Sequence, residues 1–124
     1  TSCASAFTQM AGAAALRMDR GPIHAMVREF QRRRDVIVDG LNRVPGFECR
    51  RPKGAFYVFP RITGTGIPSK VLQSQLLEDA GVAALAGEAF GKSGEGFLRF
   101  SYANSVENLE TALERIGAHI TALA

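Results

Sequence analysis

The residue best suited to chemistry in this chain is Arg99, which lies inside the stretch Gly96 to Tyr102. Apolar and polar side chains alternate along that stretch, which predicts a half-buried β-strand. An arginine keeps its charge in a protein, and its planar guanidinium fits a carboxylate or a phosphate through parallel hydrogen bonds. Arg99 therefore needs an anionic partner, which is either a neighbouring side chain or a bound ligand.

Alternation along this strand divides its side chains between two faces. Arg99 shares its face with Phe97 and Ser101, and the opposite face carries Leu98, Phe100 and Tyr102. The residue types alone fit both a locally paired arginine and a ligand-binding one.

Length and composition limit the possible architectures. The chain has 124 residues, of which 46% are hydrophobic, and this is enough for one compact domain with its own core. The formal net charge of +3 is mild and spread along the chain, so composition gives nucleic acid little support as a partner. Cys3 and Cys49 have no metal-ligand spacing, and no segment resembles a signal peptide or a membrane span. We therefore expect a cytoplasmic protein, and the start at Thr1 without a methionine predicts the tail of a longer one.

Hydrophobic periodicity and turn residues predict an α+β domain in which helices pack on a small mixed sheet. Ser69 is expected to cap a helix that Gly81 ends, and the last helix is expected to start at Asn104 or Ser105. The other predicted elements are helices over 5–19 and 22–44, a hairpin of strands 47–50 and 55–59, a strand over 82–85 and a mobile glycine-rich loop over 87–96.

Two further segments have possible binding chemistry. The basic helix face from Arg28 to Arg34 fits solvent or an interdomain contact, and a nucleic-acid surface is the alternative. The stretch Thr63 to Gly66 superficially resembles a phosphate loop, but it lacks the Gly-Lys-Ser/Thr continuation. A connecting loop is the prediction there.

Four segments together resemble the C-terminal part of class I and II aminotransferases, which are pyridoxal-phosphate enzymes of fold type I. They follow in the family's order and, with the final helix, cover nearly the whole chain. The branch that they look most like is the bacterial aspartate aminotransferase-like one. The segments are Pro52 to Pro60, Leu76 to Ala83, Gly87 to Gly91 and Gly94 to Ala103.

The resemblance implies a role for Arg99, because the family's arginine in this strand binds the α-carboxylate of the amino-acid substrate. It implies that the ring of Phe56 approaches the active-site cleft, whereas Tyr57 is expected to be structural. At Ala86 the family usually has a proline, so the rigidity of the following loop is in question. The resemblance also implies that residues 1–20 end a large cofactor domain, and that residues 21–124 form the C-terminal small domain with a long interdomain helix.

The resemblance also indicates what this segment lacks. The lysine that forms the Schiff base with pyridoxal 5'-phosphate lies upstream in the family, and none of Lys53, Lys70 and Lys92 has its flanking motif. His24 and His119 are expected on helix surfaces. We therefore expect no catalytic, cofactor-binding or metal-binding residue here, and an isolated segment without activity.

For the full-length protein the resemblance implies a homodimeric enzyme that moves an amino group between an amino acid and a 2-oxo acid, with no membrane or nucleic-acid partner. Two alternatives remain open at this stage. One is a fold type I lyase or cyclopropane-forming synthase that uses the same arginine. The other is a transcriptional regulator whose aminotransferase-like domain senses an effector.

Overall fold

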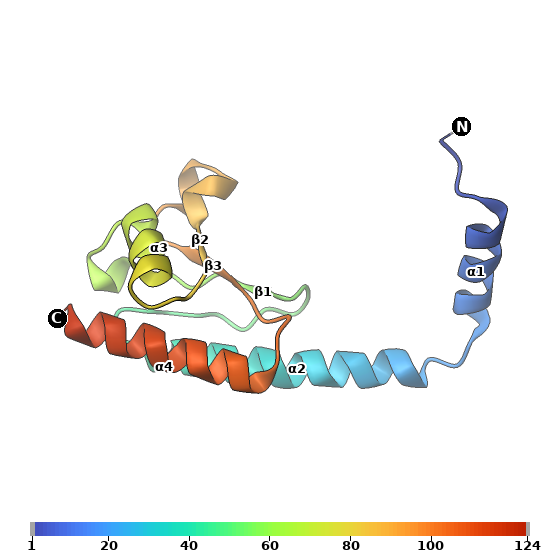
Figure 1. Cartoon of the computed structure of the whole chain (residues 1–124), viewed down its shortest axis with the longest axis horizontal. Helices are drawn as coiled ribbons and strands as arrows, with labels where there is room; N and C mark the ends of the chain where they lie inside the picture. Colours follow the sequence, from blue (N-terminus) through green and yellow to red (C-terminus); the bar gives the residue numbers. More distant parts are fainter. Residues whose placement is uncertain (1, 124) are drawn as a thin grey trace.

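The computed structural model describes residues 2–123, which form a small sheet with helices packed around it (Figure 1). The predicted α+β class is confirmed. The helices are α1 (Ala6–Arg17), α2 (Gly21–Leu41), α3 (Ser69–Glu78) and α4 (Val106–Ala122), the strands are β1 (Tyr57–Val58), β2 (Leu85–Ala86) and β3 (Leu98–Ser101), and the short 3₁₀ turns are η1 (Thr63–Thr65), η2 (Gly87–Phe90) and η3 (Lys92–Gly94).

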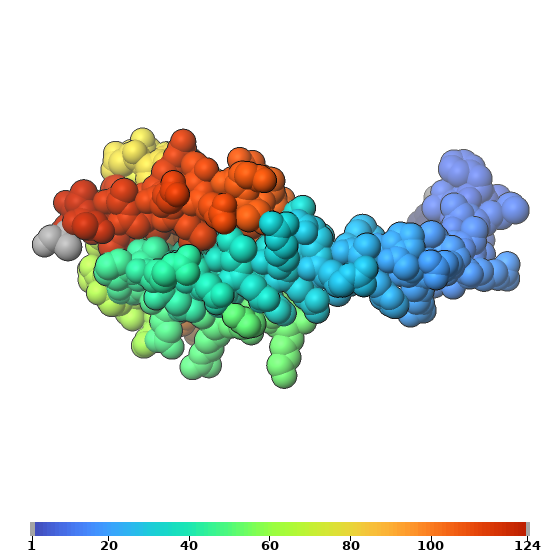
Figure 2. Space-filling view, turned by 90° about the horizontal axis from the view of Figure 1, so that it is seen from below, coloured from blue at the N-terminus to red at the C-terminus, as the bar shows by residue number. Residues whose placement is uncertain are grey.

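The N-terminal part of the chain projects away from the rest of the molecule (Figures 1 and 2). No residue of α1 is buried, and Phe7, Met10 and Leu16 are largely exposed. A proline lies in the first turn of α2, as its fixed φ favours, and the Asp19 carboxylate accepts a hydrogen bond from the Gly21 amide at 3.0 Å. In α2 the buried residues lie only in the last two turns, from Ile37 onward.

The sheet has the order β1-β3-β2, so the strand that carries Arg99 is the central one. Both pairings are antiparallel, whereas a mixed sheet was expected. The predicted hairpin of strands 47–50 and 55–59 is also wrong. Within residues 2–123 the first segment makes only an isolated bridge, from Glu48 to Arg61, which lies beyond the second segment, and β1 pairs with β3 instead. Strand pairing is set by tertiary packing, which turn residues alone do not determine.

The core lies on the face of β3 opposite Arg99. Leu98 and Phe100 are buried there, as the alternation predicted. The second half of α2 and the helix α4 run side by side and parallel along the sheet (Figure 1). Gly40 allows the two helices to approach closely, because a Cβ at this position would overlap the Leu113 side chain. The other buried apolar residues include Ile37, Leu41, Val58, Ile62, Leu72, Leu76, Ile116 and Ile120.

Helix ends show how local sequence signals compete with tertiary contacts. The Ser105 hydroxyl caps α4 by accepting the Asn108 amide at 3.2 Å, which agrees with one of the two predicted starts. Ser69 does not cap α3 as predicted, because it is the first helical residue and its buried hydroxyl accepts the Gly96 amide at 2.8 Å. The Glu95 carboxylate accepts the Ser69 amide instead, at 3.0 Å.

Candidate functional site

The Arg99 side chain is half-buried on the open face of the central strand. Two aromatic rings flank its guanidinium, one from the β1 side of the sheet and one from the loop that follows β2. The guanidinium carbon lies 4.3 Å from the centroid of the Tyr57 ring and 4.3 Å from that of the Phe90 ring. Both distances are short enough for strong cation–π attraction.

No carboxylate neutralises this guanidinium within residues 2–123. Its side chain has neither a hydrogen bond nor an ion pair there, whereas other arginines take the carboxylates of Glu29, Asp35, Asp39 and Glu48. A charge that two rings shield from water is costly unless its donors find a partner. Within residues 2–123 no neighbouring side chain is that partner, so the donors of Arg99 are open to an anion from outside this range.

The Phe90 ring is supported by a row of aromatic side chains along the same face. Phe59 meets Phe90 edge-on, with centroids 6.1 Å apart, and stacks on Phe97 with centroids 5.4 Å apart. Edge-to-face and offset arrangements of this kind are the favourable ones for aromatic pairs. The position of the Phe90 ring is therefore fixed by Phe59 as well as by its contact with Arg99.

The loop that carries Phe90 is more regular than the glycine-rich sequence predicted. It contains two 3₁₀ turns, closed by hydrogen bonds from the Gly91 amide to the Glu88 carbonyl and from the Gly94 amide to the Gly91 carbonyl. The backbones of Gly87 and Gly94 lie in contact, and a Cβ on either residue would overlap the other. Here the glycines permit close packing of the backbone, which is a different use from flexibility.

Phe56 lies apart from Arg99. Its ring contacts Phe30 of α2, with centroids 6.4 Å apart, and lines a hollow of about 470 Å³ between α2 and the loop before β1. Its neighbour Tyr57 is the residue that reaches Arg99, although a structural role was expected for it. Tyr57 is paired with Ser101 across the sheet, which puts its ring on the Arg99 face. Without knowledge of this register, the sequence alone could not predict the contact between Tyr57 and Arg99.

The residues considered above for cofactor chemistry are the three lysines and the turn η1. Lys53, Lys70 and Lys92 are all exposed, and they lie on three separate segments. In η1 the Thr65 hydroxyl donates to the Ile62 carbonyl at 2.8 Å and accepts the Ile67 amide, so this hydroxyl is used within the turn. The connecting-loop prediction for this stretch is confirmed.

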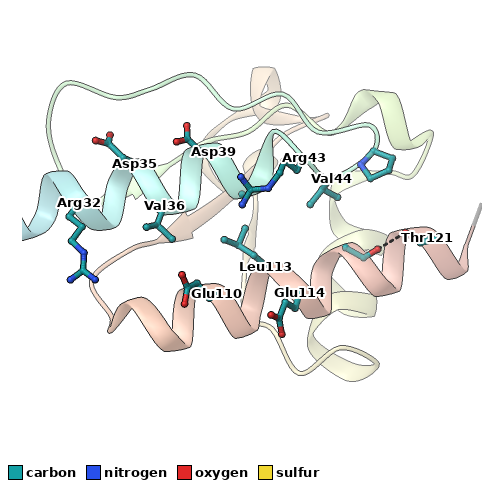
Figure 3. A pocket seen from close by; sticks show the side chains of 13 residues that line it. Arg32, Asp35, Val36, Asp39, Arg43, Val44, Glu110, Leu113, Glu114 and Thr121 are labelled. Atoms are coloured by element: carbon teal, nitrogen blue, oxygen red, sulfur yellow. Dashed lines mark hydrogen bonds between the residues drawn. The ribbon is translucent and has the colours of Figure 1, made fainter.

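A second hollow, of about 1100 Å³, lies between α2 and α4 on the other side of the molecule's core (Figure 3). Its lining mixes charges of both signs, with Arg32 and Arg43 from α2 and Glu110 and Glu114 from α4. The groups that flank Arg99 do not line it, so it is separate from the candidate site.

The remaining sequence expectations concern charge, histidines and metals. The basic face of α2 is partly neutralised, because Arg32 and Arg33 share the Glu29 carboxylate and Arg34 pairs with Asp35. His24 is exposed as expected, but His119 is half-buried in α4. Among residues 2–123 no cluster of potential ligands could hold a metal ion. No helix in the same range is both long and apolar enough to cross a bilayer.

Comparison with known proteins gives one family. Residues 1–116 match the family "Aminotransferase class I and II". The aspartate aminotransferase of Pyrococcus horikoshii is 45% identical over 114 residues, which are 90% of this chain and 29% of that protein. The crystal structure of the aspartate aminotransferase from Rhizobium meliloti superposes with a TM-score of 0.91 at 40% identity, covering 98% of this chain and 32% of that one. The crystal structure of the aromatic aminotransferase from Pyrococcus horikoshii OT3 superposes with a TM-score of 0.89 at 43% identity, covering 94% of this chain and 32% of that one.

This chain belongs to the class I and II aminotransferase family, because the family match and the shared fold both extend over nearly its whole length. The chain spans about 30% of the length of the relatives it matches. The resemblance stated from the motifs is confirmed. The relatives are aminotransferases, and neither the lyase nor the regulator alternative is favoured.

Proposed function

We propose that this chain is the C-terminal, substrate-binding domain of a pyridoxal-phosphate-dependent aminotransferase, and that Arg99 binds the α-carboxylate of its amino-acid and 2-oxo-acid substrates. The observation that carries the proposal is the half-buried guanidinium whose donors have no partner within residues 2–123. A carboxylate is the planar anion that matches those donors best.

Arg99 acts by orientation. Paired charge-assisted hydrogen bonds fix both oxygens of the carboxylate, and this restricts rotation of the substrate about its Cα. The rings of Tyr57 and Phe90 keep water away from the guanidinium, so its attraction for an anion is stronger than in open solvent. The substrate would therefore be held in a defined pose by its non-reacting end.

The remaining parts of the catalytic machinery belong to other regions of the complete enzyme. The family's cofactor, when bound, supplies an electron sink for the substrate's Cα. No residue of this chain is proposed to hold it, and without those regions we expect the segment to be inactive. Phe56 stays a proposed substrate-proximal residue, and its contact with Tyr57, at 4.4 Å between centroids, gives it an indirect link to Arg99.

The exposed apolar side chains of α1 and of the first half of α2 support the proposed domain arrangement. Phe7, Met10 and Leu16 on α1, and Met26 on α2, are at least half-exposed here, which fits helices that other parts of a larger protein cover. We propose that residues 1–20 end the large domain, that residues 21–124 form the small one, and that the complete enzyme is a cytoplasmic homodimer.

Replacing Arg99 in the complete enzyme tests the proposal. Arg99→Leu should raise the KM for amino and 2-oxo acids and lower kcat, with kcat/KM falling roughly a hundredfold to a thousandfold, as expected when two charge-assisted hydrogen bonds are lost. Cofactor absorbance should be nearly unchanged. Arg99→Lys keeps the charge but loses the planar fork, and should recover only part of the activity. Unchanged steady-state kinetics in Arg99→Leu would remove this residue from the site.

A further inference from the structure

The flanking of Arg99 by two rings is more than the capture of a carboxylate requires. An arginine without such neighbours could bind an anion from any side, because water or a ligand could reach both flat faces of its guanidinium. Here the contacts to Tyr57 and Phe90 come from separate segments, on the two sides of the central strand. A guanidinium commonly stacks its flat face on an aromatic ring, so with two such contacts an anion is expected to approach at the edges, where the N–H groups point.

We propose that Tyr57 and Phe90 are positioning residues that hold the Arg99 guanidinium in a single plane and so select an anion that approaches edge-on. The inference rests on the proposed role of Arg99. It adds a specificity device to that role, because neither ring is required to touch the substrate.

The gain comes from preorganisation. Arginine has a long side chain with high rotamer entropy, and an unrestrained guanidinium must lose that freedom when it binds an anion. The rings impose the restriction beforehand, and their electron-rich faces stabilise the cation that they contact. The anion then meets donors that are already aligned.

Each ring is itself fixed by the fold. The strand register places Tyr57 opposite Ser101, and its ring also packs against Phe56. Phe90 closes the 3₁₀ turn η2, at the end of a loop whose backbone contact between Gly87 and Gly94 sets its shape. The geometry around Arg99 is therefore a property of the sheet and the loop together.

The test compares an amino-acid substrate with its carboxamide, which lacks the anion, in the complete enzyme. The measured quantity is the ratio of the two kcat/KM values. In Tyr57→Leu and Phe90→Leu the preference for the acid should fall about fivefold to thirtyfold, the range expected for loss of a partly desolvated cation–π contact. Most of the change should be in KM, since the carboxylate is bound in both the ground state and the transition state.

Conservative and matched variants separate positioning from general damage. Tyr57→Phe keeps the ring and should keep the preference within about twofold. Phe97→Leu removes a ring that has no cation–π contact with Arg99 and reaches Phe90 only through Phe59, so it should change the preference by less than about twofold. If Tyr57→Leu does not fold, Phe90→Leu at an exposed loop position carries the test alone.

The outcomes distinguish this inference from the proposed function. An undiminished preference in Phe90→Leu and Tyr57→Leu, while Arg99→Leu abolishes it, would overturn the positioning role and leave carboxylate binding by Arg99 intact. A preference that survives in Arg99→Leu would contradict the proposed function itself. An equal fall in Phe97→Leu would also count against positioning, because that ring is not on the guanidinium.

Discussion

The Gln73 side chain joins α3 to the start of the loop that carries Phe90, because its Oε1 accepts the backbone amide of Ala86 at 2.7 Å. A proline at position 86, which the resemblance led us to expect, would have no amide to donate. With alanine at this position, the backbone amide is present and donates to the Gln73 side chain. The loop is held at this end by a hydrogen bond rather than by a fixed φ angle.

Gln73→Ala should loosen this attachment. Ala86 is buried, so its backbone amide would be left without an acceptor in this variant. The expected loss is about 1–3 kcal/mol in the free energy of unfolding, as measured by chemical denaturation. Ser74→Ala, one position along on the exposed side of α3, is the control and should change stability by less than about 0.5 kcal/mol. Equal stability of the two variants would show that the Gln73 contact is not formed in solution.

The packing of α2 on α4 predicts stability changes of opposite sign for two glycine substitutions. Gly40→Ala should destabilise the protein by about 1–3 kcal/mol, because the new methyl group overlaps the Leu113 side chain in a close-packed contact. Gly117→Ala should instead stabilise it by about 0.5–1 kcal/mol, because that position is inside α4 and has open space around a Cβ. Thermal unfolding of both variants measures the signs, and a stabilising Gly40→Ala would contradict the helix contact.

Cys49 should make stability fall at alkaline pH. Burial raises the pKa of its thiol to about 11, from 9.0 in the absence of burial. Between these values the unfolded chain loses the proton while the folded chain keeps it, so the stabilisation is complete below pH 9 and is lost as the pH rises toward 11. The loss amounts to about 2–3 kcal/mol. Urea denaturation at pH 8 and pH 10.5 should show this drop in the wild type, with a clearly smaller drop in Cys49→Ala.

The 124-residue chain by itself should not form a specific covalent adduct with pyridoxal phosphate. Its three lysines are all exposed on separate segments, so none has the desolvated environment that activates a lysine amine. Borohydride reduction followed by peptide mapping should find only low, distributed labelling. Stoichiometric labelling at any one of Lys53, Lys70 and Lys92 would contradict this expectation.

Much of the fold was predictable because the signals are local. The periodic apolar residues of α2 and α4, the proline at the start of α2 and the left-handed Gly81 after α3 all determine local conformation. The alternation around Arg99 correctly separated the core face from the open face. These features depend on residues only a few positions apart.

The errors share a different physical origin. The false hairpin and the cap assigned to Ser69 both depend on partners far along the chain, and so does the contact of Tyr57 with Arg99, which was not predicted. Ser69 bonds to Gly96, and Tyr57 reaches Arg99 only because β1 pairs with β3 in one register. Shifting that register by a single residue would turn Tyr57 to the other face, and periodicity alone does not define it.

The strand order has a consequence for how the candidate site comes into being. Within the described residues 2–123, β1 and β2 each pair only with β3, which is the last strand in that range. During synthesis neither has a partner until residues 98–101 have left the ribosome, and the β1 pairing must close a long loop. The arginine that we propose binds substrate thus arrives with the strand that completes the sheet. A chain terminated before this point would therefore lack both the charge and the framework that positions it.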